Sequence, residues 1–141
     1  MNYSRIIIGT AVATVVYYIY GFLVEGVLIR KAFSPYSAVY RSAETVMGYL
    51  PIGFACTLIG IFVVAMIYAK SYESGSGFSE GLRFGLLVGV FVVCTFVGPN
   101  YVTLNIGRKL ALELAASVVL QWTIVCVVIG LIYKPGLTIV R

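Results

Sequence analysis

The sequence predicts an all-α protein, a bundle of four transmembrane helices that forms a single domain over residues 1–141. Hydrophobic residues make up 61% of the chain and charged residues only 11%, whereas soluble domains have roughly 45–50% and about 25%. Mean hydropathy is +1.03. The apolar residues fall into four segments, each long enough to cross a bilayer core of ~30 Å. These segments are residues 6–29, 46–69, 80–98 and 110–133.

The first segment is too long for a secretory signal, so we expect it to remain in the mature protein. Small or polar residues recur at every fourth position along it. Because a helix turns once in 3.6 residues, these positions form one stripe, which predicts the side that faces the rest of the bundle. The stripe consists of Gly9, Ala13, Tyr17, Gly21 and Glu25.

The connection over residues 32–45 contains Ser34 followed by Pro35, a pair typical of a helix start. The residues after Pro35 would place aromatic side chains on one face and polar side chains on the other. This division predicts a short interfacial helix between the first two spans. The alternative is a re-entrant lid over a pore or site, whose backbone would have to be buried in protein.

Residues 70–79 are polar and predict a solvent-exposed loop, in which residues 74–77 form a flexible linker. Ser79 is then expected to cap the third helix. The glycine and proline at residues 98–99 are expected to end it, because proline disfavours the helical conformation in the preceding residue.

Gly81, Gly85 and Gly89 recur every fourth residue in the third segment, the pattern of a glycine zipper. Helices in lipid associate along small-residue grooves, where their backbones come close together. We therefore predict that these glycines pack against another helix. The pattern leaves open whether that helix belongs to this chain or to a partner.

Ionisable residues inside spans are functional candidates, because they are costly in lipid. Glu25 and Glu113 lie near the same membrane edge, each about one turn from a basic pair at residues 30–31 or 108–109. They could line an ion vestibule, bind a lipid headgroup, or form interfacial salt bridges that lock the first span to the fourth. Gln121, in mid-span, is expected to bond another helix. Together they form a candidate polar intramembrane network of Glu25, Glu113 and Gln121.

The chain has no histidine and no aspartate, which removes imidazole ligands and histidine-based nucleophile pairs. Its cysteines, Cys56, Cys94 and Cys126, lie in different segments and form no Cys-x-x-Cys pair. We therefore predict no catalytic, cofactor-binding or metal-binding residues, and no enzyme. The basic residues stand at the ends of apolar segments rather than on one face, which argues against nucleic-acid binding.

Residues 67–70, 77–89 and 129–135 read IYAK, GFSEGLRFGLLVG and IGLIYKP. With this glycine-rich third span and this aromatic-basic end, the second half of the chain resembles small four-helix bacterial membrane proteins of uncharacterised function. The resemblance implies a four-span bundle in a bacterial inner membrane and supplies no activity.

Four spans place both termini on the same side of the membrane. The ten basic residues divide five and five between the two sides, so the positive-inside rule gives no orientation. The short N-terminal tail with its charged α-amino group favours cytoplasmic termini.

These features favour a non-enzymatic accessory or structural subunit, whose partners are the lipid bilayer and either other membrane proteins or further copies of itself. The alternative is a small-solute or ion transporter or channel that acts as an oligomer. A membrane enzyme would have to rely on Glu, Cys or Tyr side chains.

Overall fold

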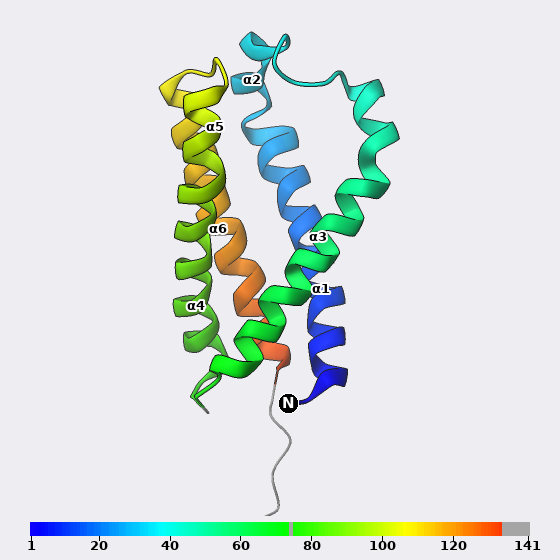
Figure 1. Ribbon diagram of the computed structural model, residues 1–141, viewed down its shortest axis with the longest axis vertical. Coiled ribbons are helices and arrows are strands. Elements are labelled where there is room, and N and C mark those ends of the chain that lie inside the picture. Colours follow the sequence, from blue (N-terminus) through cyan, green and yellow to red (C-terminus); the bar gives the residue numbers. More distant parts are fainter. Residues whose placement is uncertain (74, 134–141) are drawn as a thin grey trace, which may run out of the picture.

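A computed structural model describes residues 1–73 and 75–133, except for the side chain of Ala43. The described residues form helices and no strand. Four helices are long and apolar enough to cross a membrane (Figure 1). They are Tyr3–Leu28, Glu44–Ser71, Gly77–Thr103 and Arg108–Ile132. The predicted all-α, four-span bundle is therefore confirmed, and it is compatible with an integral membrane protein.

Ser74 and residues 134–141 lie outside the described residues. One residue of the predicted linker at 74–77 and the end of the IGLIYKP segment are therefore not described.

The first span consists of α1 (Tyr3–Leu23) and a π-helical turn, η1 (Val24–Leu28). Asn2 caps the helix by accepting a hydrogen bond from the Arg5 amide at 3.3 Å. The predicted inward stripe is confirmed: its first two members are buried and its last three are half-buried, whereas Val12, Ile19 and Leu23 are exposed.

The short helix after the first span is α2 (Arg30–Phe33), which continues as the 3₁₀ turn η2 (Ser34–Tyr36). The prediction that a helix begins at Ser34 is wrong, because the helical residues precede Pro35. Ser34 is itself helical, with φ −52° and ψ −41°, whereas an N-cap residue is extended. The chain bends at Ile29 and resumes a helix one residue later, so Ser34 closes that helix.

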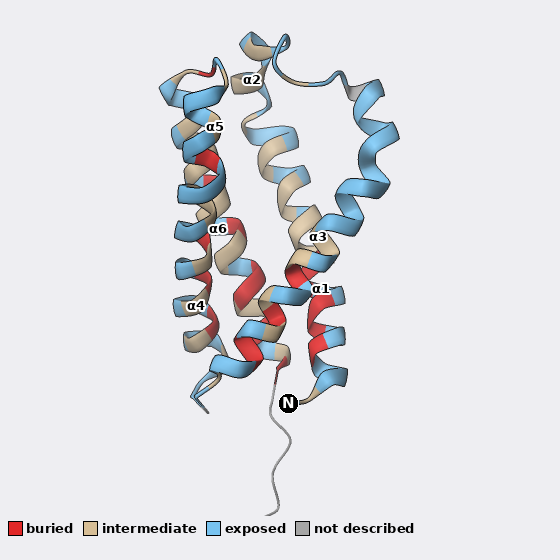
Figure 2. Cartoon of the chain, in the orientation of Figure 1, coloured by how far each residue is buried: buried red, intermediate tan, exposed pale blue. Residues whose placement is uncertain are grey.

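The second span, α3 (Ala43–Ser71), has a splayed half and a packed half. Ser42 caps it by accepting a hydrogen bond from the Thr45 amide at 3.3 Å. Every residue from Glu44 to Cys56 is exposed (Figure 2). The second half packs into the bundle through Ile61, Ala65, Tyr68 and Ala69, which are buried.

The third span consists of α4 (Gly77–Val92), the π turn η3 (Val93–Val97) and α5 (Gly98–Thr103). Two predictions here are wrong. The helix begins at Gly77, so Ser79 lies inside it, and it continues through Pro99. Pro99 is the second residue of α5 and follows directly on the π turn η3.

The fourth span, α6 (Arg108–Ile132), makes its most extensive contact with α4 and packs also against α1. The start of α1 lies beside the end of α6, where the Arg5 guanidinium donates to the Ile132 carbonyl at 3.3 Å. The buried core gathers at this end of the bundle, where α1, α3 and α6 meet. It consists of Ile6, Ala13, Ile61, Ala65, Tyr68, Ala69, Val125, Ile129 and Tyr133.

Candidate functional site

The predicted packing residues Gly81, Gly85 and Gly89 are buried against α6. A β-carbon placed on any of them would come closer to α6 than van der Waals contact allows. The atom nearest to the added β-carbon would be the Cys126 carbonyl oxygen at 2.7 Å for Gly81, the Thr123 Cα at 2.7 Å for Gly85, and the Val119 Cα at 2.9 Å for Gly89. The three glycines of α4 thus face a helix of the same chain.

Gln121 lies on α6 and is almost fully buried, with 3% of its surface exposed. Its side-chain amide donates to the Tyr17 carbonyl on α1 at 3.1 Å, so the predicted bond to another helix is confirmed. The Tyr20 hydroxyl makes a second link between the same helices by donating to the Ser117 carbonyl at 3.1 Å. The polar groups at this depth therefore join α1 to α6.

A cavity of about 290 Å³ lies between the first, third and fourth spans and contains two members of the predicted network, Glu25 and Gln121. We call it the Glu25 cavity. Among the described residues, Glu25 forms no ion pair. The lining is mostly aromatic and aliphatic: Tyr17, Glu25, Phe33, Tyr40, Val92, Phe96, Val97, Asn100, Leu104, Ile106, Leu114, Val118, Gln121 and Trp122.

Tyr40 lies outside the spans and borders the Glu25 cavity from the connection after the first span. Its phenol is half-buried. Burial raises the pKa of Tyr40 above 10, and the negative charge of Glu25 raises that pKa further. The phenol of Tyr40 is therefore harder to ionise than that of an exposed tyrosine.

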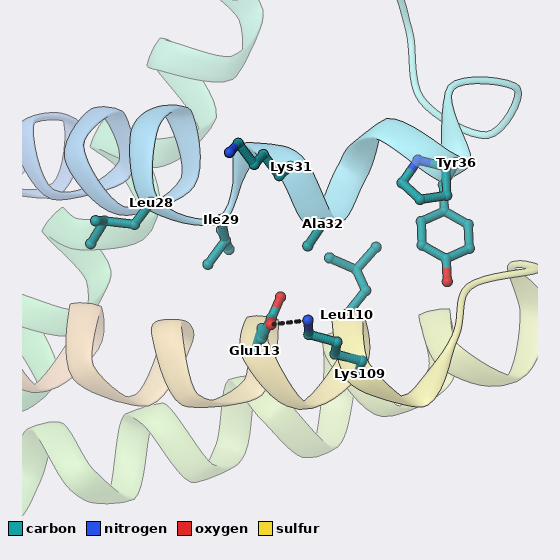
Figure 3. Close-up of a pocket in the computed structure, with 9 residues that line it drawn as sticks. Leu28, Ile29, Lys31, Ala32, Tyr36, Lys109, Leu110 and Glu113 are labelled. Atoms are coloured by element: carbon teal, nitrogen blue, oxygen red, sulfur yellow. Dashed lines mark ion pairs between the residues drawn. The ribbon is translucent and has the colours of Figure 1, made fainter.

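A second cavity, of about 320 Å³, lies where the first span ends and the fourth begins. We call it the Glu113 cavity (Figure 3). The Lys109 ammonium lies 3.9 Å from one Glu113 carboxylate oxygen, Oε1. The other oxygen, Oε2, is buried and has no hydrogen-bond partner among the described residues. The lining is Leu28, Ile29, Lys31, Ala32, Pro35, Tyr36, Lys109, Leu110 and Glu113.

The structure therefore brings Glu25 and Gln121 to one cavity and places Glu113 in another. Glu113 pairs with Lys109 on its own helix, and its cavity also contains Lys31 from the basic pair beside Glu25. Sequence reasoning missed Tyr36, whose hydroxyl accepts a hydrogen bond from the Gly107 amide at 3.0 Å and joins the two membrane-edge segments. No local pattern signals this contact, because the two residues are far apart in the chain.

Within residues 1–73 and 75–133, no group of three or more His, Cys, Asp or Glu side chains has the arrangement of a metal site. All three cysteines are free, with Cys56 and Cys94 exposed and Cys126 buried. Comparison with protein-family models, curated proteins and solved structures finds no match to this chain.

Proposed function

We propose that the protein is a non-enzymatic accessory or structural subunit that packs against a transmembrane helix of another membrane protein. The splayed half of α3 is the observation that carries this proposal. From Glu44 to Cys56 every residue is exposed, although α3 is the most apolar of the four spans. A membrane helix in this position contacts either lipid or a foreign helix.

The glycines of α3 favour a foreign helix as the occupant. Beyond the backbone of α3 itself, no described residue has an atom within 4 Å of a β-carbon added to Gly48, Gly53 or Gly60, whereas Gly81 and Gly85 on α4 are in close contact with α6. Small residues in membrane helices are enriched where backbones approach one another. The α4 glycines pack against a helix of the same chain, whereas the α3 glycines leave space for a helix of another protein.

The experiment is gentle extraction of the full chain from its native membrane, combined with cross-linking through Cys56, which is exposed on α3. We expect a stoichiometric membrane-protein partner that cross-links to Cys56. Gly53→Leu should abolish the cross-link, and the control Ile52→Leu should keep it. A homo-oligomer alone, or a cross-link that survives Gly53→Leu, would refute the proposal.

The resemblance to bacterial membrane proteins supports placement in a bacterial inner membrane, and we propose cytoplasmic termini. Single cysteines are added at the N-terminus and in the loop near Tyr40, and labelling of intact cells from outside tests the orientation. Labelling of the N-terminal cysteine from outside would reverse it.

The alternative function is transport of a small solute or ion by an oligomer, and the Glu25 cavity favours it. The cavity connects a carboxylate near one end of the first span to Gln121, which lies deeper in the bundle. Intramembrane carboxylates commonly mark solute and proton paths. Proteoliposomes that show a solute or proton flux, lost in Glu25→Gln but retained in Glu44→Gln, would favour transport over the subunit role.

A further inference from the structure

The Glu113 cavity combines a carboxylate oxygen that lacks a partner with two ammonium groups. Glu113 projects from α6 toward the segment that holds Lys31, which forms the facing wall (Figure 3). Its Oε1 faces Lys109, but its Oε2 is buried and none of the described residues donates a hydrogen bond to it. A buried acceptor without a donor destabilises a protein by about 1–3 kcal/mol. The cavity is therefore suited to a ligand that brings a donor to Oε2.

Positive charge surrounds the same cavity. Lys31 and Lys109 line it, and α6 begins at Arg108 without an acidic residue in its first turn. Cations at the start of a helix oppose its dipole, which favours anions there. An anionic group between Lys31 and Lys109 would offset this unfavourable interaction between the cations and the helix dipole. The cavity thus offers complementary surfaces to one negative and one positive group.

The remaining wall is apolar and is formed by Leu28, Ile29, Leu110 and the ring of Pro35. It lies where the first span ends and the fourth begins, which is the depth of lipid headgroups and the first acyl carbons. Lysine side chains near the ends of membrane helices reach the headgroup region. We propose that the Glu113 cavity binds a phospholipid whose headgroup carries a phosphate and a primary ammonium, with the phosphate at Lys31 and Lys109 and the ammonium at Glu113 Oε2.

The choice between headgroups follows from their hydrogen-bond donors. A primary ammonium has three N–H donors, whereas the trimethylammonium of a choline headgroup has none. A choline lipid would fill the same space and leave Glu113 Oε2 without a partner. A glycerol headgroup would place no cation beside the carboxylate.

Native mass spectrometry of the full chain in detergent tests this assignment with three lipids of identical acyl chains: phosphatidylethanolamine, phosphatidylcholine and phosphatidylglycerol. We expect phosphatidylethanolamine to bind at about tenfold lower concentration than either of the others, the difference expected for one charge-assisted hydrogen bond. Equal binding of the ethanolamine and choline lipids, or tighter binding of the glycerol lipid, would overturn the proposal.

Three variants separate the parts of the site. Glu113→Gln keeps the side-chain shape and should abolish the preference for ethanolamine over choline. Lys31→Gln should weaken binding of all three lipids several-fold. Lys70→Gln, at the other end of the bundle, is the control and should change neither the preference for ethanolamine nor the affinity for the three lipids. An unchanged preference in a Glu113→Gln protein that elutes and melts like the wild type would overturn the proposal.

Soluble glycerophosphoethanolamine distinguishes a lipid from a free phosphate compound. This compound has no acyl chains to contact the apolar wall, so it should not displace the lipid at equal concentration. Displacement at equal concentration would show that the cavity takes a soluble phosphate compound, which contradicts a lipid site.

Discussion

Gly85 on α4 lies directly against Thr123 on α6: a β-carbon on Gly85 would come within 2.7 Å of the Thr123 Cα. The same β-carbon would lie 3.0 Å from the Cys126 Cβ. No side-chain rotation relieves the first of these contacts, because the Thr123 atom belongs to the backbone. The two helices meet here with no space for a side chain on α4.

Gly85→Leu should therefore destabilise the protein by at least about 2 kcal/mol, because the larger residue forces α4 away from α6. Leu86→Ile is the control: Leu86 is exposed, so its replacement should change stability by less than about 0.5 kcal/mol. Unfolding in mixed micelles of increasing denaturing detergent measures both. Equal stability of the two variants would show that α4 and α6 do not depend on this contact.

The thiol of Cys126 should report on the same contact. Cys126 is buried, whereas Cys56 and Cys94 are exposed. In the folded protein in detergent, a maleimide should modify Cys56 and Cys94 and spare Cys126. Gly85→Leu should expose Cys126 to the reagent, and Leu86→Ile should not. Mass spectrometry of the digested protein locates the label, and modification of Cys126 at the rate of Cys56 in the wild type would contradict the packing described here.

Gln121→Leu should cost about 0.6–1.7 kcal/mol, the range for hydrogen bonds between membrane helices. The replacement removes the bond from the Gln121 amide to the Tyr17 carbonyl, which joins α6 to α1. Leu120→Ile, at an exposed neighbouring position, is the control. The same unfolding assay measures both variants, and a Gln121→Leu protein as stable as the wild type would mean that this bond contributes nothing.

Glu25→Gln should lower the pKa of Tyr40, because it removes one of the two causes that raise it and leaves burial. The phenol contributes stability that is fully present below its unfolded pKa of about 10 and is lost as the pH rises through its higher folded pKa. Ultraviolet titration, taken as the difference from Tyr40→Phe, measures the shift. Glu44→Gln is the control, and an unchanged Tyr40 titration in Glu25→Gln would place the two groups out of electrostatic contact.

The spans could be predicted from the sequence because lipid imposes a simple requirement on length and polarity. The inward face of α1 could also be predicted, because its small and polar residues follow the helical period. The predicted helix boundaries at Ser34 and Pro99 were wrong. Both residues carry signals of a helix boundary, but each lies within a helical segment that follows a bend or a π turn.

The candidate site was less predictable. The depth of Gln121 predicted a bond to another helix, but not its acceptor, because the choice of Tyr17 depends on how α1 and α6 pack. The pair of Lys109 and Glu113 was visible in the sequence as an i, i+4 spacing. The separation of Glu25 from Glu113 into two cavities was not visible, because it depends on the rotation of each helix at its end.

The two π turns, Val24–Leu28 and Val93–Val97, both contribute residues to the Glu25 cavity. A π turn contains about one residue more than an α turn, and one residue corresponds to about 100° of helix rotation. If Val93–Val97 were α-helical with the same number of residues, Asn100 would rotate by about 100° away from the cavity, although no residue of the lining would be replaced. The π turn thus decides which residues of the following helix line this cavity.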